Sequence, residues 1–518
     1  MVTTLDSVER GRSCKARATL GLVVGVGSLV VVVGLGALLK HQAQHLGPHE
    51  AASNRPLILF CAAGLKSPIE AVARQYEKAY GVAVQIQYGG SGTLLSSLRV
   101  THAGDLFLAA DESYIKSARD LGLMAEVLPL AQQRPVIAVA KGNPKGIHQL
   151  EDLSRGTCRF AIANPDAASI GRTVRGLLQK SGQWSEFEKR TTVFKPTVND
   201  VANDVRIGSV DAGIVWDATA QQYPELEMVR VPLFEAAPET VSIGVLTWCG
   251  QPVAALHFAR YLAAREKGLK EFEQAHYTTI EGDEWAETPE LRFFSGAMLR
   301  PGVEETLREF EAREGCRITT VYNGCGLLVA QMRAGEHPDA YFSCDKSFMS
   351  RVADLYGSPV TLVDDTLVLL VKKGNPERIG GVNDLTRPGL RVGLPHHEKS
   401  AMGNIAWRML QAMDLYDKLG DNLKVESPTG DFLVNQIRTG SLDAIIACKS
   451  HAAAVQAYLD AIPINHPLAH LEQPFAVGRS THYRQMTARL LEALISPTSR
   501  QRFESAGFGW RYQPSPLP

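Results

Sequence analysis

The sequence predicts an α/β protein made of two tandem modules with one fold, preceded by a single transmembrane helix. Three observations lead to this prediction: a long internal repeat, strands that alternate with helices inside each copy, and one uncharged apolar run near the N-terminus. At 518 residues the chain is long enough for several domains. Its net charge of −1, with 21% charged residues, indicates neither a nucleic-acid partner nor an acidic tail.

The apolar run covers residues 18–39 and contains no charged side chain. At about 1.5 Å per residue it can cross a hydrocarbon core of roughly 30 Å. Residues 1–17 carry four basic side chains, so the positive-inside rule keeps them in the cytoplasm and sends the chain, after a linker at 40–54, across the membrane. A cleaved signal peptide is the alternative, but its apolar region typically has only about 7–15 residues. We therefore predict a single-pass cell-membrane protein whose bulk is periplasmic.

The rest of the chain repeats itself. The segment YGGSGTLL returns as YNGCGLL, so that Cys325 lies 234 positions after Ser91. Further along, the segment KGNP occurs twice, 232 positions apart. A register this constant indicates a domain duplication, which we divide into module one at residues 55–281 and module two at residues 290–512.

Strands and helices alternate inside module one. Hydrophobic patterning predicts a buried strand at 57–61, an amphipathic helix at 68–80, a strand at 82–88, a helix from Ser91 and a strand at 106–109. Such alternation is typical of an α/β fold with a largely parallel sheet. Ligands of these sheets bind at the carboxyl ends of the strands, against helix N-termini.

Small residues occupy four strand-to-helix turns of module one, and these turns predict an anion site. In the segment YGGSGT the glycines leave backbone N–H groups uncovered, and Ser91 stands where an N-cap hydroxyl would. The turns that follow Ala62, Asn164 and Pro196 are of the same kind. Four helix starts that converge can bind a tetrahedral dianion through neutral donors. For Ser91 alone, a plain helix cap is the alternative.

The identity of the anion depends on hydrogen-bond acceptors. Molybdate, tungstate and sulfate need donors only, whereas phosphate also needs an acceptor for its remaining proton. Because Asp111, Asp200 and Asp217 lie close to these motifs in the sequence, phosphate is disfavoured but stays open.

Five segments in order, FCAAGL, YGGSGTL, GDLFLAAD, KGNP and DAGIVW, resemble the periplasmic molybdate-binding proteins of ABC importers. The resemblance covers nearly all of residues 55–280 and, more weakly, 290–512. It implies a type 2 periplasmic-binding fold, in which each module has two α/β lobes that close on a ligand by a hinge motion. It also implies a solute-binding function without enzymatic activity or cofactor, in which an oxyanion is passed to an ABC transporter permease.

The resemblance further implies a set of anion-binding positions in module one: Gly64, Gly90, Ser91, Ile170, Val198 and Trp216. Ser91 matches the second serine of the family. The first serine falls on Gly64, which offers only its backbone N–H, and a tyrosine falls on Trp216, whose indole N–H donates but does not accept. These two departures put the identity of the ion in doubt.

Module two carries cysteines where module one has Ser91, Ala110 and Trp216, namely Cys325, Cys344 and Cys448. A thiol at a helix N-terminus tends to ionise, which opposes anion binding. Together with His396 or His397, the three thiols would suit a soft metal such as Cu(I) or Zn(II). A Cys325–Cys344 disulfide and inert buried thiols are the other two interpretations. An envelope metal-binding or thiol-redox module is therefore the alternative function, and a sensor or scaffold with a degenerate cleft is a third.

Overall fold

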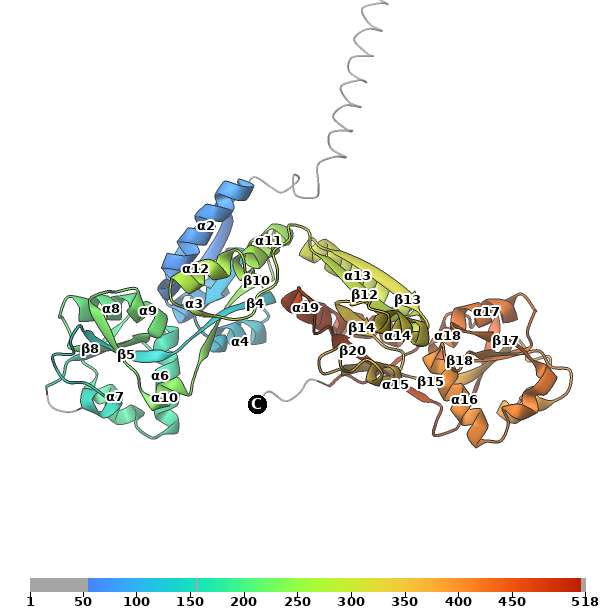
Figure 1. The fold of residues 1–518 in the computed structure, drawn as a ribbon. Coiled ribbons are helices and arrows are strands. Elements are labelled where there is room, and N and C mark those ends of the chain that lie inside the picture. The colour runs from blue at the N-terminus through green and yellow to red at the C-terminus, as the bar shows by residue number, and fades with distance from the viewer. Residues whose placement is uncertain (1–54, 155–156, 514–518) are drawn as a thin grey trace, which may run out of the picture. The chain divides into compact units, whose positions relative to one another are not determined.

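The computed structural model describes residues 55–154 and 157–513 of the chain. Within these ranges each module folds into two α/β lobes, as predicted (Figure 1). The predicted transmembrane segment at 18–39 lies outside the described residues, as do its flanks at 1–17 and 40–54. Among the helices that the structure does describe, none is long and apolar enough to cross a membrane.

The first lobe of module one is a six-stranded sheet covered by helices. Its strands are β1 (Leu57–Ala62), β2 (Val84–Gly89), β3 (Leu106–Ala109), β4 (Met124–Gln133), β10 (Glu239–Leu246) and β11 (Thr278–Thr279). Its helices are the short 3₁₀ helix η1 (Ala63–Leu65), α2 (Lys66–Tyr80), α3 (Ser91–Thr101), α4 (Glu112–Asp120), α11 (Pro252–Ala263) and α12 (Gly268–Gln274). The predicted strands and helices are confirmed here, with ends that differ by one or two residues.

The order of this sheet is β11-β4-β10-β3-β1-β2. Strand β1 pairs in parallel with β2 and β3, whereas β10 pairs antiparallel with both β3 and β4. The prediction of a largely parallel sheet is therefore wrong for this lobe, whose sheet is mixed. The reason is that the chain leaves for the second lobe after β4 and comes back along β10, so the returning strand enters the sheet from the opposite end.

The second lobe of module one is a five-stranded sheet in the order β7-β6-β8-β5-β9 with helices packed around it (Figure 1). Its strands are β5 (Pro135–Ala140), β6 (Phe160–Ala163), β7 (Val193–Lys195), β8 (Ala212–Trp216) and β9 (Leu226–Val229). Its helices are α5 (Leu150–Leu153), α6 (Ser169–Lys180), α7 (Trp184–Arg190), α8 (Val198–Arg206), α9 (Asp217–Gln221) and α10 (Pro232–Glu235). Each lobe has its own apolar core, so the lobes can move as separate bodies about their crossovers.

Short sequence signals determine where several helices of module one begin and end, including the start of α8. Helix α8 begins with a capping box, in which the Thr197 hydroxyl accepts the Asp200 N–H and the Asp200 carboxylate accepts the Thr197 N–H. Asp111 caps α4 by accepting the N–H of Tyr114 at 3.1 Å. Helix α2 ends at Gly81, whose φ of 68° is left-handed and therefore suits glycine.

Module two joins both of its lobes in one ten-stranded sheet, ordered β13-β12-β14-β20-β15-β18-β16-β17, with β19 and β21 also paired to β15. Its strands are β12 (Glu290–Gly296), β13 (Arg317–Asn323), β14 (Ala340–Phe342), β15 (Val360–Lys372), β16 (Val392–Pro395), β17 (Leu423–Ser427), β18 (Ala444–Cys448), β19 (Leu459–Pro463), β20 (His470–Val477) and β21 (Gly509–Trp510). Strand β15 runs unbroken through both lobes, whereas module one divides the same path into β4 and β5.

The helices of module two follow the order of those in module one, except that α10 has no counterpart among the described residues of module two. They are η2 (Ala297–Leu299), α13 (Arg300–Glu314), α14 (Cys325–Arg333), α15 (Lys346–Ser350), η3 (Val382–Thr386), α16 (Ala401–Ala412), η4 (Asp417–Asn422), α17 (Gly430–Arg438), α18 (Lys449–Ala453), α19 (Arg484–Leu494) and α20 (Pro497–Ser505). Helix α14 begins at Cys325 just as α3 begins at Ser91, so the repeat found in the sequence is also a structural one.

Candidate functional site

Four strand-to-helix turns of module one meet at a single small cavity between its lobes. They are the starts of η1, α3, α6 and α8, which follow β1, β2, β6 and β7. The cavity measures about 20 Å³, enough for one water molecule. All six predicted residues of module one line it: Gly64, Gly90, Ser91, Ile170, Val198 and Trp216. The structure thus brings together every position that the sequence indicated.

Two serines form the polar centre of this cavity. The Ser169 hydroxyl donates to the Ser91 Oγ at 2.8 Å, and the Ala110 N–H donates to the same oxygen at 3.3 Å. Both serine side chains are buried. Because Ser91 belongs to the first lobe and Ser169 to the second, their hydrogen bond crosses the cleft.

Backbone contacts hold the cleft shut around the serines. The Gly92 N–H donates to the carbonyl of Ala167 at 2.9 Å, and the Asn199 side-chain amide donates to the carbonyl of Ala63 at 2.9 Å. Gly90 has to be glycine here, because a Cβ would lie 2.3 Å from the Ala167 carbonyl oxygen. An ion larger than a water molecule must therefore part Ser91 from Ser169 and move the lobes.

The donors around the cavity are uncharged. No Lys, Arg or His side chain stands among the described residues that line it. The three nearby carboxylates do not line it either. Asp111 caps α4 and Asp200 caps α8, while Asp217 accepts the N–H of Arg134 at 3.0 Å. The cavity therefore offers hydroxyl and backbone N–H donors, without a carboxylate that could accept a proton from an anion.

Two hydroxyl residues of this region were missed by the sequence analysis. Ser169 is the first residue of α6, and the signal that could have found it is a hydroxyl at the start of the helix after the Asn164 turn. The Thr219 Oγ1 lies 3.4 Å from the point where a Cβ on Gly64 would stand. It is buried and has no hydrogen-bond partner among the described residues. A hydroxyl therefore lies beside Gly64, although Gly64 itself has none.

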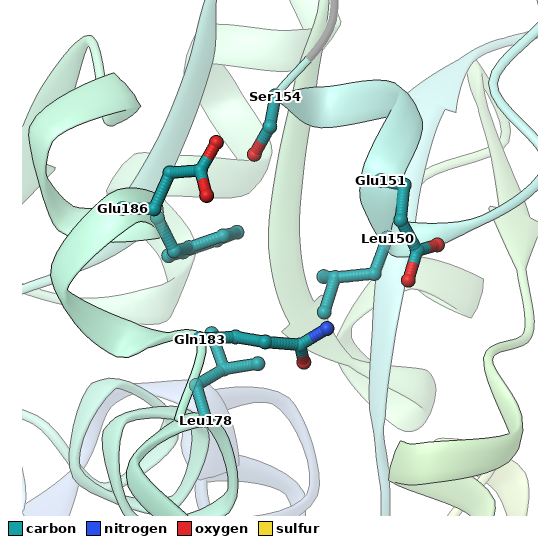
Figure 2. A pocket seen from close by; sticks show the side chains of 7 residues that line it. Leu150, Glu151, Ser154, Leu178, Gln183 and Glu186 are labelled. Carbon is teal, nitrogen blue, oxygen red and sulfur yellow. The ribbon is translucent and has the colours of Figure 1, made fainter. Parts of the chain in front are cut away.

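A larger pocket of about 250 Å³ opens elsewhere in the second lobe of module one, between α5, α6 and α7 (Figure 2). Figure 2 shows the carboxylates of Glu151 and Glu186 on its walls, with the apolar side chains of Leu150 and Leu178. Two carboxylates repel an anion, and none of the predicted residues lies here. This pocket is therefore not a second oxyanion site.

In module two the centre of the corresponding cleft is a pair of thiols. The Sγ atoms of Cys325 and Cys344 lie 2.8 Å apart, and the Cys344 N–H donates to the Cys325 Sγ at 3.1 Å. The second contact repeats the one that Ala110 makes with Ser91. Burial raises the pKa of Cys325, but hydrogen bonds from Cys344 outweigh burial, so this pKa lies below that of an ordinary thiol. The hydrogen bond to Cys325 and burial together hold the pKa of Cys344 well above its usual range.

The third predicted cysteine, Cys448, is buried at the end of β18 and lies close enough to affect the pKa of Cys344. The two candidate histidines are engaged with other groups, because His397 stacks on His396 and lies 3.8 Å from Glu426. Within residues 55–154 and 157–513, no three or more His, Cys, Asp and Glu side chains are gathered closely enough to hold a metal ion. The structure thus brings two of the three thiols into contact and leaves a three-cysteine metal site unassembled.

Comparison with known proteins agrees with this two-module architecture. The family model described as bacterial extracellular solute-binding protein matches residues 57–278 and again residues 291–509. The chain belongs to this family. It is 29% identical over 191 residues to a putative binding protein of Haemophilus influenzae, a match that covers 37% of this chain and 78% of that protein.

One further relative of this solute-binding protein and one similar solved structure are named for molybdate. The molybdate-binding protein ModA of Mycobacterium bovis is 28% identical over 250 residues, which cover 47% of this chain and 93% of that protein. Among solved structures, the periplasmic molybdate-binding protein of Azotobacter vinelandii is 19% identical with a TM-score of 0.37, and the match covers 43% of this chain and 98% of that one. Each of these proteins spans about the length of one module.

Proposed function

We propose that this solute-binding protein is a membrane-tethered receptor that captures a molybdate- or tungstate-like oxyanion in module one and delivers it to an ABC transporter permease. One observation carries the binding part of the proposal: four helix starts and the two hydroxyls of Ser91 and Ser169 converge on one buried cavity. Helix N-termini present unpaired N–H groups and the positive end of the helix dipole, which together suit an anion.

The charge of the donors favours a fully deprotonated anion. Hydroxyl and backbone N–H groups can donate to all oxygens of molybdate, tungstate or sulfate. Hydrogen phosphate would need one acceptor, and the carboxylates of Asp111, Asp200 and Asp217 are not among the groups that line the cavity. The phosphate alternative that the sequence left open therefore has less support from the geometry.

Capture would proceed by opening and reclosing the cleft. In the closed cleft the Ser169 hydroxyl donates to Ser91, so each incoming ion must replace this bond. Once the lobes part, both hydroxyls are free to donate to ion oxygens, and the buried Thr219 hydroxyl beside Gly64 can add a third. Charge-assisted hydrogen bonds are stronger than the neutral one they replace, which favours closure on the ion.

Delivery and tethering rest on other observations. The family description, bacterial extracellular solute-binding protein, and the relative named a molybdate-binding protein support an extracytoplasmic role beside a permease. The apolar residues 18–39 with basic residues before them support a tether that keeps the modules outside the membrane. Fractionation of cells that express the full chain or a chain lacking residues 1–54 tests this part; loss of membrane association only in the shortened chain is expected.

Binding is tested by isothermal titration of the full chain with molybdate, tungstate, sulfate and phosphate. We expect molybdate or tungstate to bind in the micromolar range or tighter, with phosphate much weaker. If no tetrahedral oxyanion binds more tightly than about 1 mM, a binding free energy of only about −4 kcal/mol, the proposal is refuted.

A further inference from the structure

The cleft of module two has two cysteine sulfurs at its centre. Cys325 stands at the position of Ser91 in module one, and Cys344 stands at the position of Ala110. We propose that Cys325 and Cys344 form a reversible disulfide, which acts as a thiol-modification site and sets the charge of the module-two cleft. This inference does not depend on oxyanion binding by module one.

The two sulfur atoms are already in contact. The Sγ atoms of Cys325, the first residue of α14, and Cys344, two residues after the end of β14, lie 2.8 Å apart. Both elements belong to the first lobe of module two. A disulfide requires an S–S distance of about 2.05 Å, so the sulfurs need to approach by less than about 1 Å. The final S–S bond therefore forms without movement of one lobe against the other. Cys325 and Cys344 are both buried, so the cleft must first open to admit the oxidant.

The surrounding residues make room for this pair. A Cβ at Gly296 would lie 2.0 Å from the Cys344 Sγ and 3.2 Å from the Cys325 Sγ, so only glycine leaves space for the sulfurs. Module one has Ala62 and Ala110 at the positions of Gly296 and Cys344. Relative to module one, residue 296 is thus smaller and residue 344 is larger. This is the difference expected if Gly296 makes room for the buried pair of sulfurs.

Hydrogen bonds prepare Cys325 to react. Its Sγ lies 2.8 Å from the Cys344 Sγ, accepts the Cys344 N–H at 3.1 Å and accepts the Ser343 hydroxyl at 3.9 Å. These donors favour the thiolate over the thiol at Cys325, in line with its lowered pKa. The thiolate is the nucleophilic form of cysteine, so Cys325 is the attacking sulfur of the pair.

The oxidant required is a low-molecular-weight disulfide. The Cys325 thiolate attacks one of its sulfurs, and the first small thiolate leaves as a mixed disulfide forms at Cys325. Cys344 then gives up its proton and attacks the Cys325 Sγ, which expels the second small thiolate. In total the two cysteine thiols lose two electrons and two protons, and the oxidant becomes two thiols. Extracytoplasmic compartments favour this direction.

Oxidation changes the charge of the cleft. In its thiolate form Cys325 would hold a negative charge at the position where module one has the Ser91 hydroxyl, and this charge would repel an anion. The disulfide is neutral. The cleft of module two would therefore repel anions when the Cys325–Cys344 pair is reduced, and it would lose this repulsion when the pair is oxidised.

The test uses the reduced full chain equilibrated in buffers of oxidised and reduced glutathione, followed by acid quenching, unfolding, alkylation and peptide mass spectrometry. We expect a linked Cys325–Cys344 peptide that appears with oxidising buffer and disappears with dithiothreitol. Cys316 is the matched control, because it is a buried cysteine of the same module, and it should be recovered alkylated. The ultraviolet absorbance of a thiolate near neutral pH should be present in the reduced protein and lost on oxidation.

The variant Cys344→Ser identifies the attacking sulfur, since it should trap glutathione on Cys325 as a stable mixed disulfide. Recovery of both cysteines as alkylated thiols from oxidising buffer would overturn the proposal. So would a Cys344–Cys448 link in place of the expected one, or a tightly held soft metal that keeps both thiols reduced. Because the wild-type measurement stands alone, a variant that fails to fold does not remove the test.

Discussion

Removal of one oxygen atom, in the variant Ser91→Ala, is the most direct test of the module-one cleft. The Ser91 side chain is only 1% exposed, and its Oγ receives hydrogen bonds from Ser169 and from the Ala110 N–H. In the bound state the same hydroxyl would donate to a dianion. A hydrogen bond to a charged group is worth about 1.5–3 kcal/mol, and about 1.4 kcal/mol corresponds to tenfold in Kd, so the loss amounts to roughly 10- to 150-fold.

The structure narrows this range. The wild-type protein must break the Ser169–Ser91 hydrogen bond before it binds an ion, at a cost of about 1 kcal/mol, and the variant does not. The difference leaves about 0.5–2 kcal/mol, so we expect the dissociation constant for molybdate or tungstate to rise by about twofold to thirtyfold in isothermal titration. Ser96→Ala is the matched control, because Ser96 is an exposed serine of the same helix α3. A Ser91→Ala protein that binds as tightly as the Ser96→Ala protein would refute the assignment of Ser91 to the site.

Two further predictions concern buried charges. Burial, together with the negative charges of Asp111 and Glu112, raises the pKa of Glu239 to about 7. The folded state then binds more protons than the unfolded state between about pH 4 and pH 7, so the free energy of unfolding falls as pH rises through this window. Urea unfolding at pH 5 and pH 8 should show this fall in the wild type but not in Glu239→Gln. The variant should be the more stable protein at pH 8, by up to about 3 kcal/mol. An equal change of the free energy of unfolding with pH in the two proteins would contradict this. In module two, Arg489 donates to the buried carboxylate of Glu314 at 2.6 and 3.0 Å. Arg489→Met should therefore lower the free energy of unfolding by about 3–5 kcal/mol in urea unfolding. A loss below about 1 kcal/mol would show that the carboxylate of Glu314 becomes solvated or protonated in the variant.

The sequence was sufficient to locate the cleft of module one because local signals determine it. Glycine and serine after a strand leave N–H groups free at a helix start, and the carboxyl ends of neighbouring strands lie at one edge of a sheet. Gly64, Gly90 and Ser91 follow from this rule within the first lobe. The position of Ser169 in the site does not follow from this rule. Its contact with Ser91 depends on how closely the second lobe approaches the first, which no local sequence pattern encodes.

The direction of the central strands was a different kind of error. Alternating strands and helices predict a parallel sheet when the chain stays in one sheet, but here it passes between two lobes along β4 and β10. The cysteines of module two show the same limit. Their type and position are plain in the sequence, yet whether Cys325 meets Cys344 or Cys448 depends on packing at the scale of one ångström.

The last prediction concerns Gly296 and Cys344 of module two. Module one has a larger residue, Ala62, at the first position and a smaller one, Ala110, at the second. Gly296→Ala places a Cβ 2.0 Å from the Cys344 Sγ, in a backbone conformation (φ −56°, ψ 132°) that alanine tolerates, so the cost comes from overpacking and should be about 1–3 kcal/mol. The same change in a Cys344→Ala background recreates the Ala62 and Ala110 pair of module one and should cost little. Urea unfolding of the four proteins under reducing conditions gives the coupling between the two sites as a double-mutant cycle. If Gly296→Ala costs the same with and without the Cys344 sulfur, then the glycine does not make room for the thiol pair, and the two changes from module one are independent.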